Sequence, residues 1–319
     1  MEFDKISLQL QVENGLSGRR ISMANLKKIL VAYDGSSHSK AALGWAMLLG
    51  NYDNAELDVI KVFEPNDPPP AAFTAPRVEQ YAEIEEEDRQ MLKDVEAECK
   101  RRCKLKVHVD LLLGYVASTL LDYAVQNEVD LIVVGTRGHG VIEGMLVGSV
   151  TNSMVSLSKV PVLVVKEQQG PTSLKNILVA YDGSEAAMNA LNLAVDIGRN
   201  ANAKLVALKV SDSLDSCTEA GAAMRLKATL DGVDEADRKV LAEAQAAAAA
   251  KGMEIGTDLL TGVDIADTIL QYAAERNPDM IVAGAVGHGF LGELMIGSVV
   301  RNLISSSRIP VLTVKKAIT

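Results

Sequence analysis

Two stretches of this sequence share a spacing of glycines that could hold phosphate groups. The pattern is G-x2-G-x9-G-S, formed by Gly135, Gly138, Gly148 and Ser149 and again by Gly284, Gly287, Gly297 and Ser298. Glycine has no Cβ, so backbone amides can approach a polyanion, and a helix that opens at the Gly-Ser pair adds free N–H groups. The pattern predicts an anion site in each half of the chain. Glycines needed only for turns and packing would give the same spacing.

Polar side chains between these glycines offer weaker chemistry. His139 and His288 stand in matching Gly-His-Gly turns, where a phosphate hydrogen bond, a catalytic role and an ordinary loop position all stay open. Arg137 adds a positive charge to the first loop, and Val286 replaces it in the second. No G-x-S-x-G elbow or G-x4-G-K-[ST] loop occurs. This excludes the serine-hydrolase and P-loop arrangements that those motifs mark.

The segments that position these residues also occur twice. Residues 28–36 (KILVAYDGS) return as residues 176–184 (NILVAYDGS), and VPVLVVK at 160–166 returns as IPVLTVK at 309–315. A repeat of this length indicates a duplicated domain rather than a solenoid unit. We therefore expect four parts: a mobile extension at 1–25, a first domain at 26–166, a linker at 167–174 and a second domain at 175–319. Translation from Met23 would remove most of the extension.

Strand and helix patterns alternate within each copy. In the first copy we expect strands at 29–33, 57–63, 105–113, 131–134 and 162–165, and helices at 41–49, 78–102, 116–127 and 149–157. Residues 65–76 contain five prolines and predict an irregular loop. This order predicts two α/β domains, each a doubly wound, Rossmann-like parallel sheet of five strands. The terminal strands 162–165 and 311–314 are apolar, and we expect them to pair with each other as an intrachain pseudo-twofold dimer.

Composition limits the classes of partner. The net charge is −10 and 48% of the residues are hydrophobic, so neither a nucleic-acid scaffold nor a membrane-surface protein is expected. The three cysteines, Cys99, Cys103 and Cys217, do not form a disulfide framework. No apolar run approaches the roughly 20 residues that span a bilayer, and the N-terminus lacks a signal-peptide core. These features favour a cytoplasmic location.

The strand that ends in Asp-Gly-Ser, the glycine spacing and the closing Val-Pro-Val-Leu-Val-Val strand together resemble the universal stress protein family. The chain is similar to its tandem form, and the glycine spacing is that of the ATP-binding branch. The resemblance implies a fold like that of the adenine nucleotide alpha hydrolases. It covers nearly everything except the extension and the linker.

The resemblance also implies a set of binding residues. The carboxylate that closes the first strand contacts the adenosine part, the backbone near the end of the second strand reads the adenine edge, and the glycine loop holds ribose and phosphates. For the first site these are Ala32, Asp34, Val62, Gly135, Arg137, Gly138, His139, Gly148, Ser149 and Val150. For the second they are Ala180, Asp182, Val210, Gly284, Gly287, His288, Gly297, Ser298 and Val299. Thr151 becomes Val300, which removes a hydroxyl beside the second site.

These observations lead to a functional hypothesis with two rivals. We expect a protein that binds ATP, or ADP or AMP, at two sites and works as a nucleotide-responsive stress sensor or adaptor, with slow hydrolysis or none because no general base is evident. One rival is a weak ATPase or phosphotransferase, and the other is a structural partner-binding protein with vestigial sites. Whether Mg²⁺ accompanies the phosphates, whether a further homodimer forms and which protein partner is engaged stay open.

Overall fold

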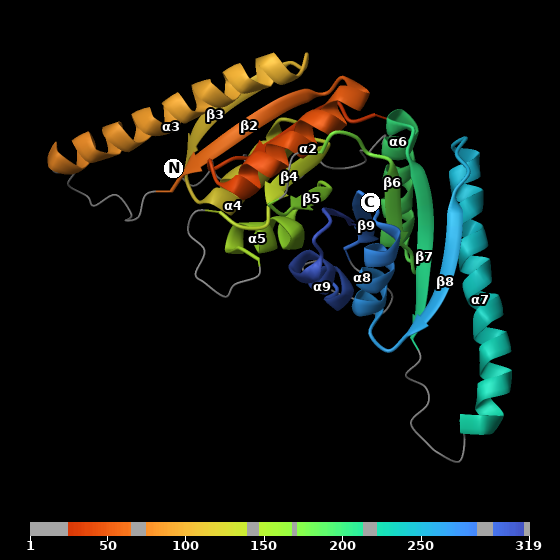
Figure 1. Cartoon of the computed structure of the whole chain (residues 1–319). Helices are drawn as coiled ribbons and strands as arrows, with labels where there is room; N and C mark the ends of the chain where they lie inside the picture. Colours follow the sequence, from red (N-terminus) through yellow and green to blue (C-terminus); the bar gives the residue numbers. More distant parts are fainter. Residues whose placement is uncertain are drawn as a thin grey trace, which may run out of the picture.

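A computed structural model describes residues 25–64, 75–138, 147–167, 171–212, 222–285 and 296–315. Strands and helices alternate through the described part of the first repeat (Figure 1). They are β1 (Lys28–Ala32), α2 (Ser37–Asp53), β2 (Glu56–Phe63), α3 (Ala75–Arg102), β3 (Val107–Leu113), α4 (Val116–Gln126), β4 (Leu131–Gly135), α5 (Ser149–Leu157) and β5 (Val162–Val165). The expected extension, apart from Asn25, lies outside the described residues.

The second repeat has the same order. Its elements are β6 (Asn176–Ala180), α6 (Glu185–Ala201), β7 (Lys204–Asp212), α7 (Ala222–Ala250), β8 (Gly256–Gly262), α8 (Ile265–Arg276), β9 (Met280–Gly284), α9 (Ser298–Ser306) and β10 (Val311–Val314). Each repeat thus supplies five strands, which confirms the α/β class expected from the sequence.

Two helices begin earlier than predicted. Helix α2 starts at Ser37 rather than residue 41 because the side chain of Ser36 accepts a hydrogen bond from the Ser39 amide, at 3.2 Å, and caps the helix. Helix α3 starts at Ala75, so the predicted loop at 65–76 is wrong for its last two residues. Pro76 then lies in the first turn, where its missing N–H is tolerated. Residues 65–74 of that loop lie outside the described residues.

The ten strands of the described residues join in one sheet, in the order β3-β2-β1-β4-β5-β10-β9-β6-β7-β8. Neighbours within each repeat are parallel, whereas β5 and β10 pair antiparallel, with Leu163 opposite Leu312. This confirms the predicted pairing of the two terminal strands. Because β5 and β10 are antiparallel, the strands of the first repeat and those of the second have their carboxyl ends on opposite sides of the sheet. Parallel α/β sheets bind ligands at the carboxyl ends of their strands, and we call each of these two sides a carboxyl edge.

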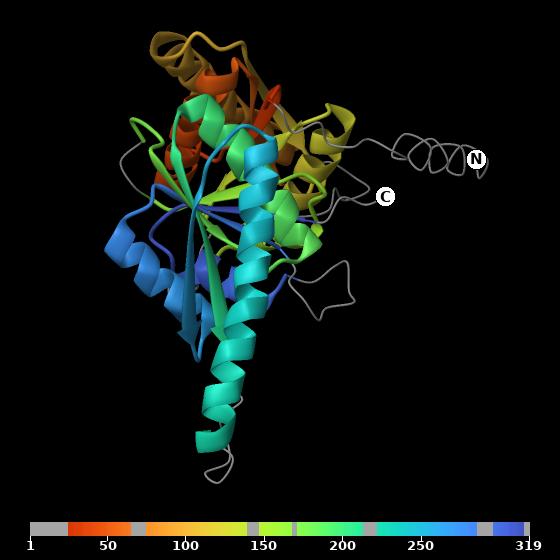
Figure 2. The same cartoon turned by 90° about the vertical axis from the view of Figure 1, so that its right-hand side faces the viewer.

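Helices cover both faces of this sheet. One core lies under α2, α3, α6 and α7, and a second core lies under α4, α5, α8 and α9. The long helices α3 and α7 lie beside the edge strands β3 and β8 at the two ends of the molecule (Figure 1). The second view shows α7 continuing past the ends of β7 and β8 (Figure 2). The strands between the two cores are therefore buried on both sides, as their continuous apolar runs predict.

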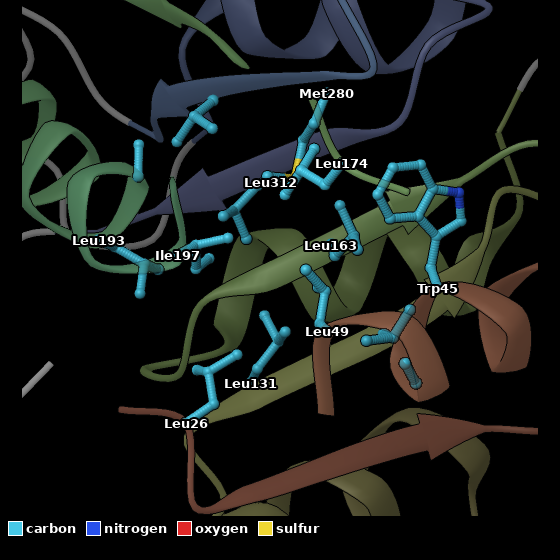
Figure 3. Packing of buried hydrophobic residues seen from close by; sticks show 14 of the residues in the cluster. Leu26, Trp45, Leu49, Leu131, Leu163, Leu174, Leu193, Ile197, Met280 and Leu312 are labelled. Atoms are coloured by element: carbon cyan, nitrogen blue, oxygen red, sulfur yellow. The ribbon is translucent and has the colours of Figure 1, made fainter. Parts of the chain in front are cut away.

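The seam between the repeats is apolar. Leu163 and Leu312 are buried side by side, with Trp45 of α2 and Leu174, from the segment before β6, packed next to them (Figure 3). Residues of both repeats thus belong to a single core on this face. The buried area that holds the strands together is continuous across the seam, so we expect the two repeats to unfold together.

Two lysines also cross the seam. Lys166, which follows β5, donates from Nζ to the Ser305 carbonyl in the last turn of α9, at 2.7 Å. Lys315, which follows β10, donates in the same way to the Ser156 carbonyl in the last turn of α5. A cation at the C-terminus of a helix satisfies free carbonyls and the negative end of the helix dipole. Each repeat therefore completes a helix of the other.

Candidate functional site

A tight turn fixes the carboxylate that follows β1 and its counterpart after β6. Gly35 and Gly183 both have φ of 85°, a conformation that glycine adopts without strain. The turn lets Asp34 Oδ1 accept from the Ser36 amide at 3.0 Å, and Asp182 Oδ1 accept from the Ser184 amide at 2.9 Å. The sequence Asp-Gly-Ser thus holds one carboxylate at the carboxyl edge of each half of the sheet.

Helices α5 and α9 begin without a side-chain cap. Their N-cap residues are Gly148 and Gly297, which have no side chain to cap them. By contrast, Ser36, Ser184 and Asp264 cap α2, α6 and α8 with side-chain oxygens. The first intrahelical bond of α5 runs from the Asn152 amide to the Gly148 carbonyl, so the three amides before it point out of the helix. Helix α4, which begins after Tyr115, also lacks a side-chain cap.

The glycines of the predicted phosphate loop serve two different purposes. A Cβ at Gly135 would lie 2.7 Å from the Cβ of His38, and one at Gly284 would lie 2.7 Å from the backbone of Ala186. These two glycines are required because α2 and α6 cross the strand ends closely. This is the packing role given above as the alternative to phosphate binding. Gly138 is different, since it is exposed and a Cβ there would strike Oδ2 of Asp34. Its backbone therefore borders the predicted ligand carboxylate.

A cavity of about 540 Å³ opens at the carboxyl edge of the second repeat. Of the second-site residues predicted from the sequence, it is lined by Ala180, Asp182, Val210, Gly284, Gly297, Ser298 and Val299. The structure thus brings together the end of β6, the end of β7 and the start of α9 around one space. Gly287 and His288, the other two predicted residues, lie outside the described residues.

The same features lie around the equivalent edge of the first repeat. The described members of the predicted first site are Ala32, Asp34, Val62, Gly135, Arg137, Gly138, Gly148, Ser149 and Val150, and His139 lies outside the described residues. Strands β2 and β4 flank β1, so Val62 and Gly135 lie on either side of the turn that holds Asp34. The Gly148 amide donates to the Thr136 carbonyl at 2.9 Å, which brings the start of α5 to the end of β4.

Thr151 makes a structural contact at the start of α5. Its hydroxyl donates to the Gly135 carbonyl at 2.7 Å, and the side chain is buried. Val300 occupies the matching position in α9, is also buried and is among the residues that line the second cavity. The hydroxyl therefore ties α5 to the end of β4. Its replacement by valine leaves an apolar side chain at this point of the second cavity.

His38, which is not among the candidate residues predicted from the sequence, lies beside one residue of the predicted first site. It lies in the first turn of α2 against Gly135. Burial lowers the pKa of His38 below its ordinary value, Glu167 and Asp34 oppose that shift, and the positive charges of Arg137 and Lys166 add to it. Ala186 takes the corresponding place in α6, so the described part of the second site has no titratable group there.

Sequence reasoning missed two ion pairs near the sites. Lys209 and Asp237 both line the second cavity, and their Nζ and Oδ1 atoms are 3.2 Å apart. Lys61 and Asp88 form the matching pair in the first repeat, at 3.0 Å. The available signal was a lysine at the same point of both apolar second strands and an Asp-Arg dipeptide at the same point of both long helices.

The described part of the chain has neither a clustered set of metal ligands nor a membrane-spanning helix. No group of three or more His, Cys, Asp or Glu side chains there is placed to hold a metal ion. None of the described helices has the length and apolar character needed to cross a membrane.

Comparisons with known proteins agree with the fold and the repeat. The model of the universal stress protein family matches residues 25–166 and again residues 173–315. A universal stress protein of Mycolicibacterium smegmatis is 27% identical over 293 residues, which covers 90% of this chain and 96% of that protein. One from Methanocaldococcus jannaschii is 30% identical over 150 residues, covering 47% of this chain and 86% of that protein.

A solved structure of a universal stress protein from Archaeoglobus fulgidus has the same fold. It superimposes with a TM-score of 0.67 at 22% identity and covers 91% of this chain and 98% of its own. The family model matches the chain twice, in agreement with the two copies of the Asp-Gly-Ser turn and the glycine-capped helix. The chain therefore belongs to the universal stress protein family, in a form with two family domains in tandem.

Proposed function

We propose that this chain binds one adenine nucleotide at each of two sites and acts as a nucleotide-responsive sensor or adaptor, with slow hydrolysis or none. The observation that carries this proposal is the cavity of the second repeat. It has a fixed carboxylate, Asp182, on one side and the open amides at the start of α9 on the other. A nucleoside phosphate has hydroxyl groups that can donate to the carboxylate. It also has an anionic phosphate that can accept from the amides.

Each part of the cavity has a proposed role. The Asp182 carboxylate accepts hydrogen bonds from the ribose, the backbone at Val210 contacts the base, and the amides that follow Gly297 bind phosphate oxygens. Asp34, Val62 and the amides that follow Gly148 take the same roles in the first repeat. We propose the ranges 26–166 and 175–319 as the two binding domains, joined by residues 167–174, and the cytoplasm as their location. ATP, ADP and AMP all fit this scheme, and Mg²⁺ would accompany the phosphates.

Removal of Asp182 tests the proposal. Asp182→Ala removes the carboxylate, so calorimetry should find one nucleotide per chain where the wild type binds two. Asp279→Ala is the matched control. That carboxylate also accepts from two backbone amides, those of Lys175 and Asn176, but at the opposite end of β6. The control should lose stability and keep both sites.

Two measurements on the unmodified protein decide between the proposal and its rivals. Nucleotide at about 100 times its Kd should stabilise the fold by about 2.7 kcal/mol per site, which a melting curve detects. An unchanged melting temperature with ATP, ADP and AMP would overturn the proposal and leave a partner-binding protein with vestigial sites. Steady release of phosphate from ATP, lost in Asp34→Ala, would show a weak ATPase. Mass spectrometry of nucleotide carried through purification would identify the natural ligand.

A further inference from the structure

The ion pairs Lys61–Asp88 and Lys209–Asp237, named here the strand–helix pairs, are unusual because of their surroundings. Each joins the second strand of a repeat to the long helix over it, and the four side chains are only 10–15% exposed. Placing two charges where water is scarce is expensive, and an apolar pair of similar volume often supports a fold equally well. A pair that only held the helix in place would gain little from being charged.

The second pair lies at one end of the cavity. Lys209 and Val210 are consecutive residues of β7, and both line the cavity together with Asp237 of α7. The start of α9, where phosphate is proposed to bind, packs beside β9. Strand β6 separates β9 from β7, so two strand spacings, about 10 Å, lie between the phosphate end and the pair. The pair is therefore at the end of the cavity where the base of a bound nucleotide would lie.

The pair offers a donor and an acceptor side by side. The Lys209 ammonium can donate only, and the Asp237 carboxylate can accept only. Ser211 Oγ also donates to Asp237 Oδ2, which holds the carboxylate in place. Adenine presents a complementary edge, with the N6 amino donor beside a ring-nitrogen acceptor. Guanine and hypoxanthine have a carbonyl acceptor where adenine has the amino group, so a fixed carboxylate would face an oxygen.

We propose that the strand–helix pairs select adenine. In each repeat the carboxylate accepts from the exocyclic amino group of the base and the ammonium donates to a ring nitrogen. This inference rests on the proposed function, since it assigns the base specificity of those same sites. The first repeat has Phe63 where the second has Ser211. Both repeats therefore have a strand–helix pair, but the first has no serine at the position that holds the carboxylate in place in the second.

The test compares ATP with ITP, which differ at the position that the carboxylate reads. Wild-type protein should bind ATP about tenfold or more tightly than ITP, as expected for a paired contact to a base edge. Replacing both pairs with apolar residues of similar size (Lys61→Met, Asp88→Leu, Lys209→Met, Asp237→Leu) should bring that ratio close to one. The ratio of ATP to AMP affinity should not change, because the pairs lie away from the phosphate end.

A third, partly buried pair provides the control. Lys251 and Asp196 are 2.5 Å apart in the second repeat, and they are not among the residues that line the cavity. Lys251→Met with Asp196→Leu should leave the ratio of ATP to ITP affinity at its wild-type value. If the fourfold variant fails to fold, Asp88→Asn with Asp237→Asn tests the same point. An amide can turn its NH₂ group to a carbonyl, so the ratio should shift toward ITP.

The possible results distinguish a failure of nucleotide binding from a failure of base recognition by the strand–helix pairs. Wild-type protein that binds no purine nucleotide would end the proposed function itself. Wild-type protein that binds ATP and ITP equally, or variants of the strand–helix pairs that keep the wild-type ratio, would overturn the base-reading role alone. An altered ATP to AMP ratio in the apolar variants, with an unchanged ATP to ITP ratio, would mean that the lysines contact phosphate instead.

Discussion

The two repeats surround their sites with the same backbone and with different side chains. Both have the Asp-Gly-Ser turn at φ of 85° and a helix that starts at an uncapped glycine. The first repeat adds His38, where the second has Ala186. The backbone features that would bind any nucleotide are thus kept in both copies, and the side chains that would tune charge are not. We therefore expect the two proposed sites to differ in affinity rather than in the kind of ligand.

Positive charge gathers at the edge of the first site. Burial lowers the pKa of Lys166, and the charges of Arg137 and Arg308 lower it further, which shows that these three cations are near one another. Arg308 comes from the second repeat, just before β10. Lys315, the counterpart of Lys166, has its pKa lowered by burial. On a chain with net charge −10, we expect this concentration of cations to favour a polyphosphate at the proposed first site.

Separating the repeats would have the largest effect on this comparison. Val164 and Thr313 lie in the antiparallel seam, and both are buried. Val164→Lys together with Thr313→Lys places two unpaired charges there, which should cost several kcal/mol each and force β5 from β10. Small-angle scattering should then show a larger radius of gyration. An unchanged scattering profile would contradict the importance of the seam.

Gly138→Val should remove one site and leave the other. Gly138 is exposed, so the fold should persist, but a branched side chain would collide with the Asp34 carboxylate and displace it. Calorimetry with ATP should then report one nucleotide per chain instead of two, with the wild-type affinity of the second site. Retention of both sites would contradict the placement of the nucleotide against Gly138 and Asp34.

Arg137→Val makes the first loop resemble the second at one residue. A guanidinium that contacts phosphate, partly exposed, contributes on the order of 1–2 kcal/mol, so ATP affinity at the first site should fall about tenfold. AMP affinity should change less. The measurement is a two-site titration at low salt, where screening is weak. Equal affinities of the two sites in the wild type would rule out this source of asymmetry.

The smallest predicted effect is the pH dependence that His38 gives to stability. Burial lowers the pKa of His38 in the folded chain, so the unfolded chain takes up the proton first as pH falls below about 6.5. The free energy of unfolding should therefore decrease on acidification through that range, and His38→Ala should remove a small part of the decrease. Urea unfolding at pH 7.5 and pH 5.5 measures it. Identical pH dependence in the two proteins would assign the decrease to other groups.

Repetition made most of the fold predictable. Two copies of each apolar strand, Asp-Gly-Ser turn and Gly-Ser helix start gave their order, and the bounds of α5 and β5 were predicted correctly. The apolar character of the last strand in each copy also predicted the seam. The strands, turns and helix starts were predictable because their patterns are local in the sequence. The seam was predictable because an apolar edge strand needs a partner.

The parts of the site that escaped prediction depend on how helices lie over strands. Lys61 and Asp88 are 27 positions apart, and their contact needs a particular rotation of α3 that no local pattern encodes. The packing role of Gly135 likewise requires the close crossing of α2 at His38. The same crossing places His38 against Gly135, a contact that the spacing of His38 in the sequence could not show.

The lysine contacts across the seam affect how the protein behaves on dilution and how far the sequences of its two repeats can diverge. Two separate copies of one domain could exchange the same contacts, but they would part at low concentration, and every substitution would appear in both. Here Lys166 and Lys315 belong to one chain, so the exchanged contacts form at an effective concentration that the short connection sets. The contacts across the seam therefore persist at any protein concentration. One site can acquire an arginine that the other lacks, while the strands between them stay matched.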